Sequence, residues 1–203
     1  MKMTFQDLAK RILARPCVHP VRLVAVDGGA GAGKTTFAGR LAASLGGVPV
    51  IPMDDFISFD DLTEFWSRLE GQVLTPLFQG RDVRYQKRDW VNDLHGSGLG
   101  DWREVPFFET VVLEGVGASR QALASRLTYA VWVDAPSEVR LQRGLERDAG
   151  IEGIRAIWEQ WMIGEERFLD ADGARGRADM VVDGTMRCET HEFVILTLPE
   201  RDM

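Results

Sequence analysis

Gly28-Gly29-Ala30-Gly31-Ala32-Gly33-Lys34-Thr35 is the stretch that decides which fold this sequence predicts. It fits the pattern G-x-x-x-x-G-K-[ST], in which glycines allow the backbone to curl around an anion and to turn its N–H groups inward. In that pattern Lys34 reaches the β- and γ-phosphates of a nucleotide, and the hydroxyl of Thr35 is a ligand for Mg²⁺. We therefore expect Gly28 to Thr36 to bind the phosphates of a nucleoside triphosphate.

The segments on either side of this loop support that interpretation. Residues 21–26 form an apolar run rich in β-branched side chains, which is typical of a buried parallel strand. Residues 36–45 carry Phe37, Leu41 and Leu45 along one helical face, and the positive end of this helix points at the loop. The alternative is a glycine-rich turn in an ordinary βα unit, and the strand–loop–helix order favours phosphate binding.

Length, composition and charge limit the classes of protein to consider. A chain of 203 residues with 45% hydrophobic and 27% charged residues is expected to form one domain, residues 1–203. Its net charge of −7 argues against a surface for nucleic acid. No apolar run is long enough to cross a membrane, and the N-terminus lacks the apolar core of a signal peptide, so we expect a cytoplasmic protein. Cys17 and Cys188 fit no metal or redox spacing.

Apolar runs alternate along the chain with segments of helical periodicity. Strands are predicted at residues 21–26, 48–53, 111–113, 129–133 and 178–182, with a candidate edge strand at 193–198. Helices are predicted at residues 4–14, 36–45, 60–69, 121–126, 137–147 and 151–169, with Thr4 as the first N-cap and Gly71 closing the third helix. The alternation predicts an α/β fold of three layers, in which a parallel sheet of about five strands has helices on both faces.

Three acidic residues directly follow predicted strands: Asp54, Glu114 and Asp134. Ligands of open parallel sheets lie beyond the carboxyl ends of the strands, so these residues are candidates for further chemistry. Asp54 is a candidate base for the proton of an attacking hydroxyl, and the alternative is an Asx turn or a helix N-cap. Glu114 is a candidate for holding Mg²⁺, and the alternative is a charge that leaves a buried strand for solvent; Gly115 permits a close approach to the loop and favours the first interpretation.

Two helical segments carry further patterns. Arg140, Arg143 and Arg147 share one face of a predicted helix, where they either stabilise the charge of a transferring phosphate or form a solvated surface. On the long helix, Trp158 and Trp161 lie on an apolar stripe, which indicates core packing or, alternatively, the contact face of a homodimer. The residues alone leave these alternatives open.

Together these pieces resemble the uridine kinase-like group of P-loop small-molecule kinases, which includes pantothenate kinase and phosphoribulokinase relatives. The matching segments are VAVDGGAGAGKTT (24–36), MDDF (53–56), VVLEGV (111–116) and RLQRGLERD (140–148), in the same order and with similar spacing. The resemblance implies the P-loop nucleoside triphosphate hydrolase fold, ATP and Mg²⁺ as cofactors, and transfer of a phosphoryl group to a hydroxyl of a small molecule.

The resemblance also implies roles for individual residues. Asp54 corresponds to the general base, Glu114 to the acid that helps to hold Mg²⁺, and Lys34 to the catalytic lysine of the loop. Residues 137–150 correspond to a lid helix region over the phosphates. This region brings three arginines to the nucleotide: Arg143 in a catalytic role, and Arg140 and Arg147 in binding.

The acceptor site departs from the pattern of the group. Uridine kinases carry a tyrosine–aspartate pair and a downstream His-x-Arg that hold the nucleoside, and no His-x-Arg is present here. Residues 71–108 are expected to form the acceptor-binding insertion, because they are rich in aromatic and basic residues. The candidate acceptor-binding residues are Asp54, Phe56, Tyr85, Asp89 and Trp90, although Phe56 on its own is more typical of a core residue.

Three functions are worth comparing. A kinase of a small hydroxyl compound accounts for all of these residues, with nucleosides as the leading acceptors and pantothenate-like or sugar-like compounds as the alternative. A regulatory GTPase would need an N-K-x-D motif, which the sequence lacks. A non-catalytic nucleotide-binding module would not need a base, a Mg²⁺ acid and lid arginines together.

Overall fold

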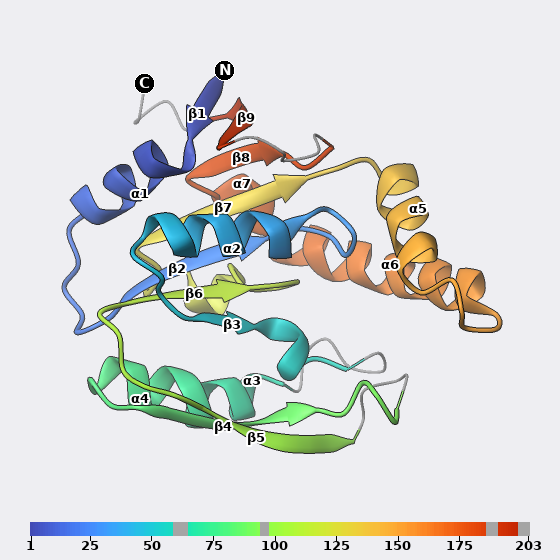
Figure 1. Cartoon of the computed structure of the whole chain (residues 1–203), viewed down its shortest axis with the longest axis horizontal. Coiled ribbons are helices and arrows are strands. Elements are labelled where there is room, and N and C mark those ends of the chain that lie inside the picture. Colours follow the sequence, from blue (N-terminus) through green and yellow to red (C-terminus); the bar gives the residue numbers. More distant parts are fainter. Residues whose placement is uncertain (59–64, 94–97, 186–190, 199–203) are drawn as a thin grey trace.

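A computed structural model describes residues 1–58, 65–93, 98–185 and 191–198 of the chain. Within those residues, seven strands form one sheet (Figure 1). In spatial order they are β1 (Lys2–Thr4), β9 (Glu192–Thr197), β8 (Met180–Asp183), β7 (Tyr129–Asp134), β2 (Arg22–Asp27), β6 (Thr110–Glu114) and β3 (Val50–Pro52). The neighbouring strands from β8 to β3 are parallel. The prediction of an α/β fold with a mainly parallel sheet is therefore confirmed.

The other end of the sheet is antiparallel. β9 pairs with β8 on one side and with β1 on the other, antiparallel in both cases. The expectation that residues 193–198 form an edge strand is therefore wrong, because β1 is the strand at the edge. The sequence pattern did not predict β1, since a strand of three residues carries no readable alternation and is ordered by its pairing with residues 192–194.

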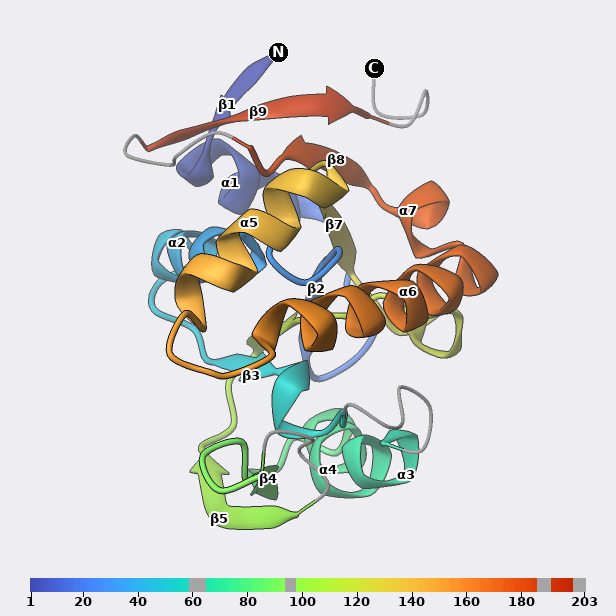
Figure 2. The same ribbon diagram turned by 90° about the vertical axis from the view of Figure 1, so that its right-hand side faces the viewer.

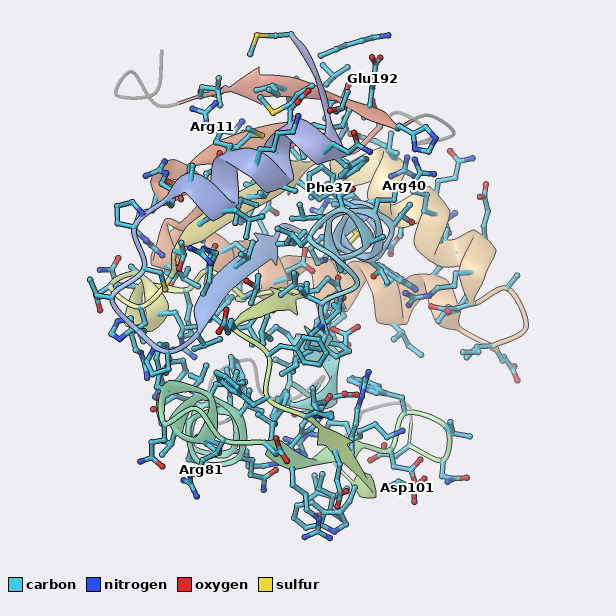
Figure 3. All side chains as sticks on the ribbon, turned by 60° about the vertical axis from the view of Figure 1, so that its left-hand side comes forward. Arg11, Phe37, Arg40, Arg81, Asp101 and Glu192 are labelled. Carbon is cyan, nitrogen blue, oxygen red and sulfur yellow. The ribbon has the colours of Figure 1, made fainter. Side chains whose placement is uncertain are left out.

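The central strands are buried on both faces. Val24 of β2 packs with α1 (Phe5–Ala14) and α2 (Lys34–Ser44), whereas the residues on either side of it belong to the core of the opposite layer. Phe37 of α2 lies between the two helices (Figure 3), with its ring centroid 4.9 Å from that of Phe5. This two-sided burial explains why the strand has a continuous apolar sequence.

A small unit of helices and a β-hairpin belongs to the opposite layer and lies below the sheet in Figure 1. It consists of α3 (Trp66–Leu69), a π-helical segment (Glu70–Leu74), α4 (Thr75–Phe78), β4 (Val83–Arg88) and β5 (Leu99–Val105). The prediction that Gly71 ends the helix at residues 60–69 is wrong, because the helical path continues to Phe78. Leu69, Val73 and Leu77 are buried along it, and their burial outweighs the roughly 1 kcal/mol that a helical glycine costs. Residues 60–64 of the predicted helix lie outside the described residues.

Two of the remaining helices lie at the end of the sheet where β2 finishes (Figure 1 and Figure 2). α5 (Ser137–Arg147) and α6 (Ile154–Asp172) lie across this end (Figure 2), and α7 (Ala174–Arg177) follows α6. Two short 3₁₀ turns, η1 (Met53–Asp55) and η3 (Gln121–Leu123), complete the described elements. None of the helices among these residues is long and apolar enough to span a membrane.

α5 and α6 contact each other through a glycine and a tryptophan. Trp158 of α6 is only 6% exposed, and a side chain at Gly144 of α5 would clash with its indole ring. The indole Nε1 donates a hydrogen bond to Oδ2 of Asp148 at 2.9 Å. Core packing is therefore the correct interpretation of Trp158, and its ring is not available as a dimer face.

Gly144→Ala is expected to lower the free energy of unfolding by about 1–3 kcal/mol, because the added methyl group would force α5 away from Trp158. The matched control is Gly39→Ala in α2, where an added Cβ meets nothing within 4 Å. The control should raise stability by up to about 1 kcal/mol, because alanine is the better helix former. Urea unfolding measures both variants, and a Gly144→Ala protein as stable as the wild type would contradict the described contact.

Candidate functional site

The loop from Gly28 to Gly33 connects the carboxyl end of β2 to α2, as the motif predicts. Gly28 has a φ of 141°, and a side chain there would clash with the carbonyl oxygen of Val133 on β7. Gly33 has a φ of 99° and stands at the N-cap position of α2. Both conformations are readily adopted only by glycine. The glycines at the two ends of the motif are thus required by the path of the backbone.

Functional groups from the loop, from the start of α2 and from the end of β6 meet where the loop joins α2. The buried ammonium group of Lys34 donates a hydrogen bond to the carbonyl oxygen of Gly29 at 2.9 Å. The hydroxyl of Thr35 donates to Oε1 of Glu114 at 3.2 Å. Glu114 is the last residue of β6 and is 6% exposed. The structure therefore brings together the two residues that the sequence suggests for Mg²⁺.

The oxygen atoms of Thr35 and Glu114 fit a Mg²⁺ ion that is shared with a nucleotide. Mg²⁺ is usually held by one or two protein oxygens, with water and phosphate oxygens as its other ligands. In the described ranges no group of three or more His, Cys, Asp or Glu side chains could hold a metal by itself. Burial raises the pKa of Glu114, the charge of Lys34 opposes this shift, and the charge of Asp54 adds to it.

Asp54 lies in η1, directly after β3. Its side chain is exposed, and no described residue donates a hydrogen bond to its carboxylate. Its backbone carbonyl oxygen accepts a hydrogen bond from Nε1 of Trp90 at 2.7 Å. The alternative interpretation of Asp54 as an Asx turn or N-cap is therefore not supported, and its carboxylate is available for chemistry.

The neighbouring Asp55 is engaged with the hairpin instead. Its Oδ2 accepts a hydrogen bond from the hydroxyl of Tyr85 at 2.8 Å and lies 3.7 Å from the guanidinium of Arg103. Burial raises the pKa of Asp55, and the hydrogen bond from Tyr85 opposes the shift. Of the two consecutive aspartates, Asp55 thus fastens η1 to the hairpin, and Asp54 faces solvent.

The other candidate acceptor-binding residues lie in different surroundings. Phe56 and Tyr85 are fully buried, with ring centroids 5.0 Å apart, so the structure supports the core interpretation of Phe56 and gives neither ring a surface for an acceptor. Asp89 accepts hydrogen bonds from the backbone and side-chain amides of Asn92, which closes a turn. Trp90 is partly exposed and reaches η1 through its indole, so it is the aromatic candidate that remains beside Asp54.

A buried aspartate just outside the motif was missed by sequence reasoning. Asp27 is 0% exposed, and its Oδ1 accepts from the amides of Gly28 at 2.7 Å and Gly117 at 3.0 Å. Its Oδ2 accepts from the amide and the hydroxyl of Ser119, both at 2.8 Å. Burial raises the pKa of Asp27, and the hydrogen bonds from Ser119 oppose this shift. Asp27 fastens the segment after β6 to the start of the phosphate loop. It ends an apolar run, so the rule that singled out Asp54 and Glu114 would have found it.

The three arginines of α5 differ in their partners. Arg140 forms a 2.5 Å ion pair with Glu165 of α6, a fully buried residue that the sequence did not single out. Arg143 donates a hydrogen bond to the loop carbonyl of Gly31 at 3.2 Å. Arg147 pairs with its neighbour in the chain, and its side chain is 68% exposed. The interpretation as one solvated face is therefore wrong for Arg140 and Arg143, because both contact the phosphate loop.

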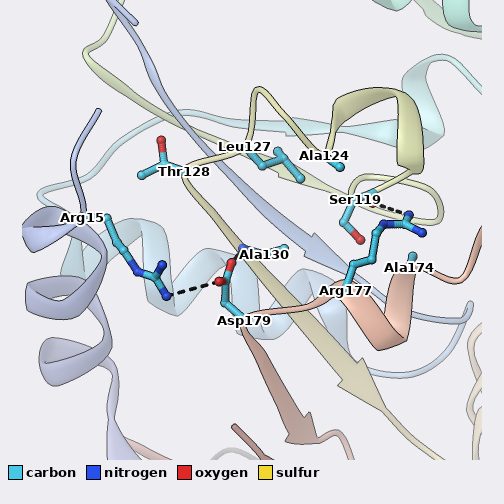
Figure 4. A pocket seen from close by; sticks show the side chains of 9 residues that line it. All are labelled: Arg15, Ser119, Ala124, Leu127, Thr128, Ala130, Ala174, Arg177 and Asp179. Atoms are coloured by element: carbon cyan, nitrogen blue, oxygen red, sulfur yellow. Dashed lines mark hydrogen bonds and ion pairs between the residues drawn. The ribbon is translucent and has the colours of Figure 1, made fainter. Parts of the chain in front are cut away.

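Two further features lie outside this site. Asp134, the third acid at a strand end, accepts hydrogen bonds from Nε1 of Trp132 at 3.2 Å and from Arg175 at 3.1 Å. A cavity of about 240 Å³ lies at the amino-terminal end of β7, where Arg15 and Asp179 form a 3.2 Å ion pair (Figure 4). None of the residues predicted to bind nucleotide or acceptor lines this cavity.

Comparisons with known proteins agree with the motifs. No family model matches the chain. Uridine kinase of Borrelia duttonii (strain Ly) is 21% identical over 182 residues, covering 80% of this chain and 86% of that protein. Uridine kinase of Halobacterium salinarum is 23% identical over 206 residues, covering 86% of this chain and 90% of that protein. A possible uridine kinase from Bacillus stearothermophilus has a similar structure, with a TM-score of 0.61 at 22% identity over 87% of this chain and 96% of that one. The predicted resemblance to uridine kinase-like P-loop kinases is confirmed.

Proposed function

We propose that this protein is an ATP-dependent kinase that transfers the γ-phosphate to a hydroxyl of a small molecule, with a nucleoside as the leading acceptor. The observation that carries the proposal is the meeting of Lys34, Thr35 and Glu114 at the loop, beside an Asp54 whose carboxylate is exposed. β3 and β6 are parallel neighbours, with Pro52 opposite Glu114, so Asp54 and Glu114 belong to adjacent strand ends. The similarity to uridine kinases over four fifths of the chain supports the proposal.

The residues of the site divide the chemistry between them. Asp54 accepts the proton of the acceptor hydroxyl while the oxygen of that hydroxyl forms a bond to the γ-phosphorus. The bond from the γ-phosphorus to the β,γ-bridging oxygen breaks at the same time, and that oxygen leaves with ADP. Lys34 offsets the negative charge of the β- and γ-phosphates. Mg²⁺, held through Thr35 and Glu114, would neutralise charge on the phosphate oxygens when bound. Arg143 adds positive charge beside the loop.

A screen for ADP release tests this proposal. Purified protein is incubated with MgATP and with nucleosides, vitamins or sugars, and Lys34→Ala serves as the control for contaminating kinases. The expected result is that ADP release is clearly fastest with one of the nucleosides. If ADP release is fastest with a vitamin or a sugar, the protein is a kinase but its acceptor is not a nucleoside. ATP binding without ADP release for any acceptor would favour the non-catalytic module.

A second candidate acceptor is an acidic compound that is not a nucleoside, such as a pantothenate-like carboxylate. It is favoured by three guanidinium groups that converge on the residues after Asp54. Arg68 donates a hydrogen bond to the carbonyl oxygen of Asp55 at 3.2 Å. Arg88 donates one to the carbonyl oxygen of Phe56 at 2.9 Å. Arg103 lies 3.7 Å from the Asp55 carboxylate.

Lys87 of β4 adds a fourth positive charge that interacts with Asp55. The cluster of Arg68, Lys87, Arg88 and Arg103 stands out because the whole chain has a net charge of −7. A local excess of one charge attracts ligands of the opposite sign. An acceptor that carries a carboxylate or phosphate would fit this side of Asp54 better than a neutral nucleoside would.

Lys87→Met is expected to separate the two candidates. If the acceptor is acidic, the variant should lower kcat/KM for it about tenfold through the loss of a charged contact, and KM for ATP should not change. The assay compares pantothenate with pantothenol and ribose 5-phosphate with ribose. The matched control is Arg84→Met, since Arg84 pairs with the exposed Glu104 on the hairpin. Equal use of acidic and neutral acceptors by the wild type would reject the acidic candidate.

A further inference from the structure

Two opposite charges are buried together behind the phosphate loop. Glu165 of α6 is 0% exposed, the side chain of Arg140 of α5 is 11% exposed, and the guanidinium lies 2.5 Å from Oε1 of the carboxylate. Burying a charge is unfavourable unless it is paired and hydrogen-bonded. The burial of this pair is therefore tolerated only because the two charges are closely paired and hydrogen-bonded. The proposed phosphoryl transfer does not explain why they are buried at this place.

Both members of the pair contact the loop at Ala30. The amide of Ala30 donates a hydrogen bond to Oε2 of Glu165 at 2.7 Å, and its carbonyl oxygen accepts one from Arg140 at 3.4 Å. Nε1 of Trp161, one turn earlier on α6, donates to the same Oε2 at 3.1 Å. One residue of the loop is thus held through both of its backbone groups by two helices.

The glycines on either side of Ala30 allow this contact. A side chain at Gly29 would clash with the guanidinium of Arg140 and approach Oε1 of Glu165 to 2.8 Å. A Cβ at Gly31 would lie 2.5 Å from the backbone carbonyl oxygen of Arg140. The pair and the loop backbone are therefore in direct contact, and the glycines of the motif serve this packing as well as the phosphates.

We infer that Glu165 and Arg140 form a neutral brace that sets the shape of the phosphate loop, and that Arg140 acts through the loop instead of binding the nucleotide phosphates. Glu165 is then a positioning residue. This inference rests on the proposed binding of nucleotide by the loop. It differs from the role that the resemblance implies for Arg140, which is direct contact with the nucleotide.

The brace predicts whether each substitution weakens or tightens the binding of ATP. Arg140→Met leaves an unpaired negative charge beside the loop and should weaken binding about tenfold, the order expected for one uncompensated charge within about 10 Å of an anion. Glu165→Gln keeps a hydrogen-bond acceptor for Ala30 but leaves Arg140 unpaired, so it should tighten binding by a similar factor. The double variant restores neutrality and should bind ATP within about threefold of the wild type.

Isothermal titration calorimetry of ATP with the full chain measures this set of variants. Glu166→Gln is the matched control, because Glu166 is the exposed neighbour of Glu165 on α6. Amide hydrogen exchange at Ala30 gives a second readout: protection should persist in Glu165→Gln and be lost in Glu165→Ala. If Arg140→Met does not fold, Arg140→Lys replaces it and should bind ATP like the wild type, because the charge is kept.

A double variant that binds ATP as weakly as Arg140→Met would overturn the inference, because that result requires direct contact between Arg140 and the nucleotide. So would an unprotected Ala30 amide in the wild type, or an Arg140→Lys protein with tenfold weaker binding. A wild-type protein that binds no nucleotide would instead reject the proposed function, and the exchange at Ala30 would still decide whether the brace exists.

Discussion

Asp54→Asn is expected to lower kcat by about 10²–10⁴-fold while the Kd for ATP stays within about twofold of the wild type. An asparagine has the shape of aspartate but cannot accept the proton of the acceptor hydroxyl. The carboxylate of Asp54 is exposed and receives no hydrogen bond from the described residues, so its loss should not disturb the fold. Single-turnover measurement of ADP formation, with ATP binding measured separately by calorimetry, tests this prediction.

Asp55→Asn is the control that distinguishes the two consecutive aspartates. The carboxylate of Asp55 is held by Tyr85 and Arg103, so its variant should act on the KM for the acceptor or on stability, with a much smaller change in kcat. Full activity of Asp54→Asn would reject the assignment of the base. A loss of kcat in Asp55→Asn as large as that in Asp54→Asn would show that the two act as a unit.

The strand–loop–helix arrangement around Gly28 to Gly33 was predictable because its signals are local. A strand, a glycine loop, a lysine and a helix follow one another within residues 21–45, and the rule that ligands lie beyond strand ends singled out Asp54 and Glu114. In the structure Glu114 accepts a hydrogen bond from the hydroxyl of Thr35, in agreement with that rule. Each piece of this arrangement is specified by its neighbours in sequence.

The contacts that support the loop were not predictable, because the residues that form them are far apart in sequence. Glu165 contacts a loop residue 135 positions away, and the donors to Asp27 from Gly117 and Ser119 are 90 and 92 positions away. On α6, Glu165 is one of several acidic residues, and nothing in its spacing separates it from the exposed Glu166. Whether an acidic side chain is buried depends on tertiary packing. The helical periodicity of the sequence does not specify that packing.

The error at Gly71 has a related cause. Glycine is a weak helix former, and the propensity rule therefore ended the helix there. The buried positions Leu69, Val73 and Leu77 continue the path on the other side of it. A propensity of about 1 kcal/mol is smaller than the burial of a single large apolar side chain, at about 1.5–3 kcal/mol, so packing decides the boundary.

Asp27→Ala is expected to lower the free energy of unfolding by about 3 kcal/mol or more. The carboxylate accepts four hydrogen bonds, from Gly28, from Gly117 and twice from Ser119. Its removal would leave buried donors without acceptors, and each such donor costs about 1–3 kcal/mol. Asp27→Asn is not a mild substitute, because its NH₂ group would face at least one backbone N–H donor whichever way the amide is turned. The same substitutions should weaken ATP binding, since Gly28 begins the phosphate loop.

Urea unfolding at constant m-value measures this loss, and Asp134→Asn is the matched control. Asp134 ends the neighbouring strand β7, but its side chain is 36% exposed and pairs with Arg175 at the surface. An exposed pair of this kind contributes about 0–1 kcal/mol, so the control should unfold close to the wild type. Equal stability of the Asp27 and Asp134 variants would mean that the four hydrogen bonds do not hold the loop. A large loss in Asp27→Ala alone would show that the phosphate loop depends on a residue that its motif does not contain.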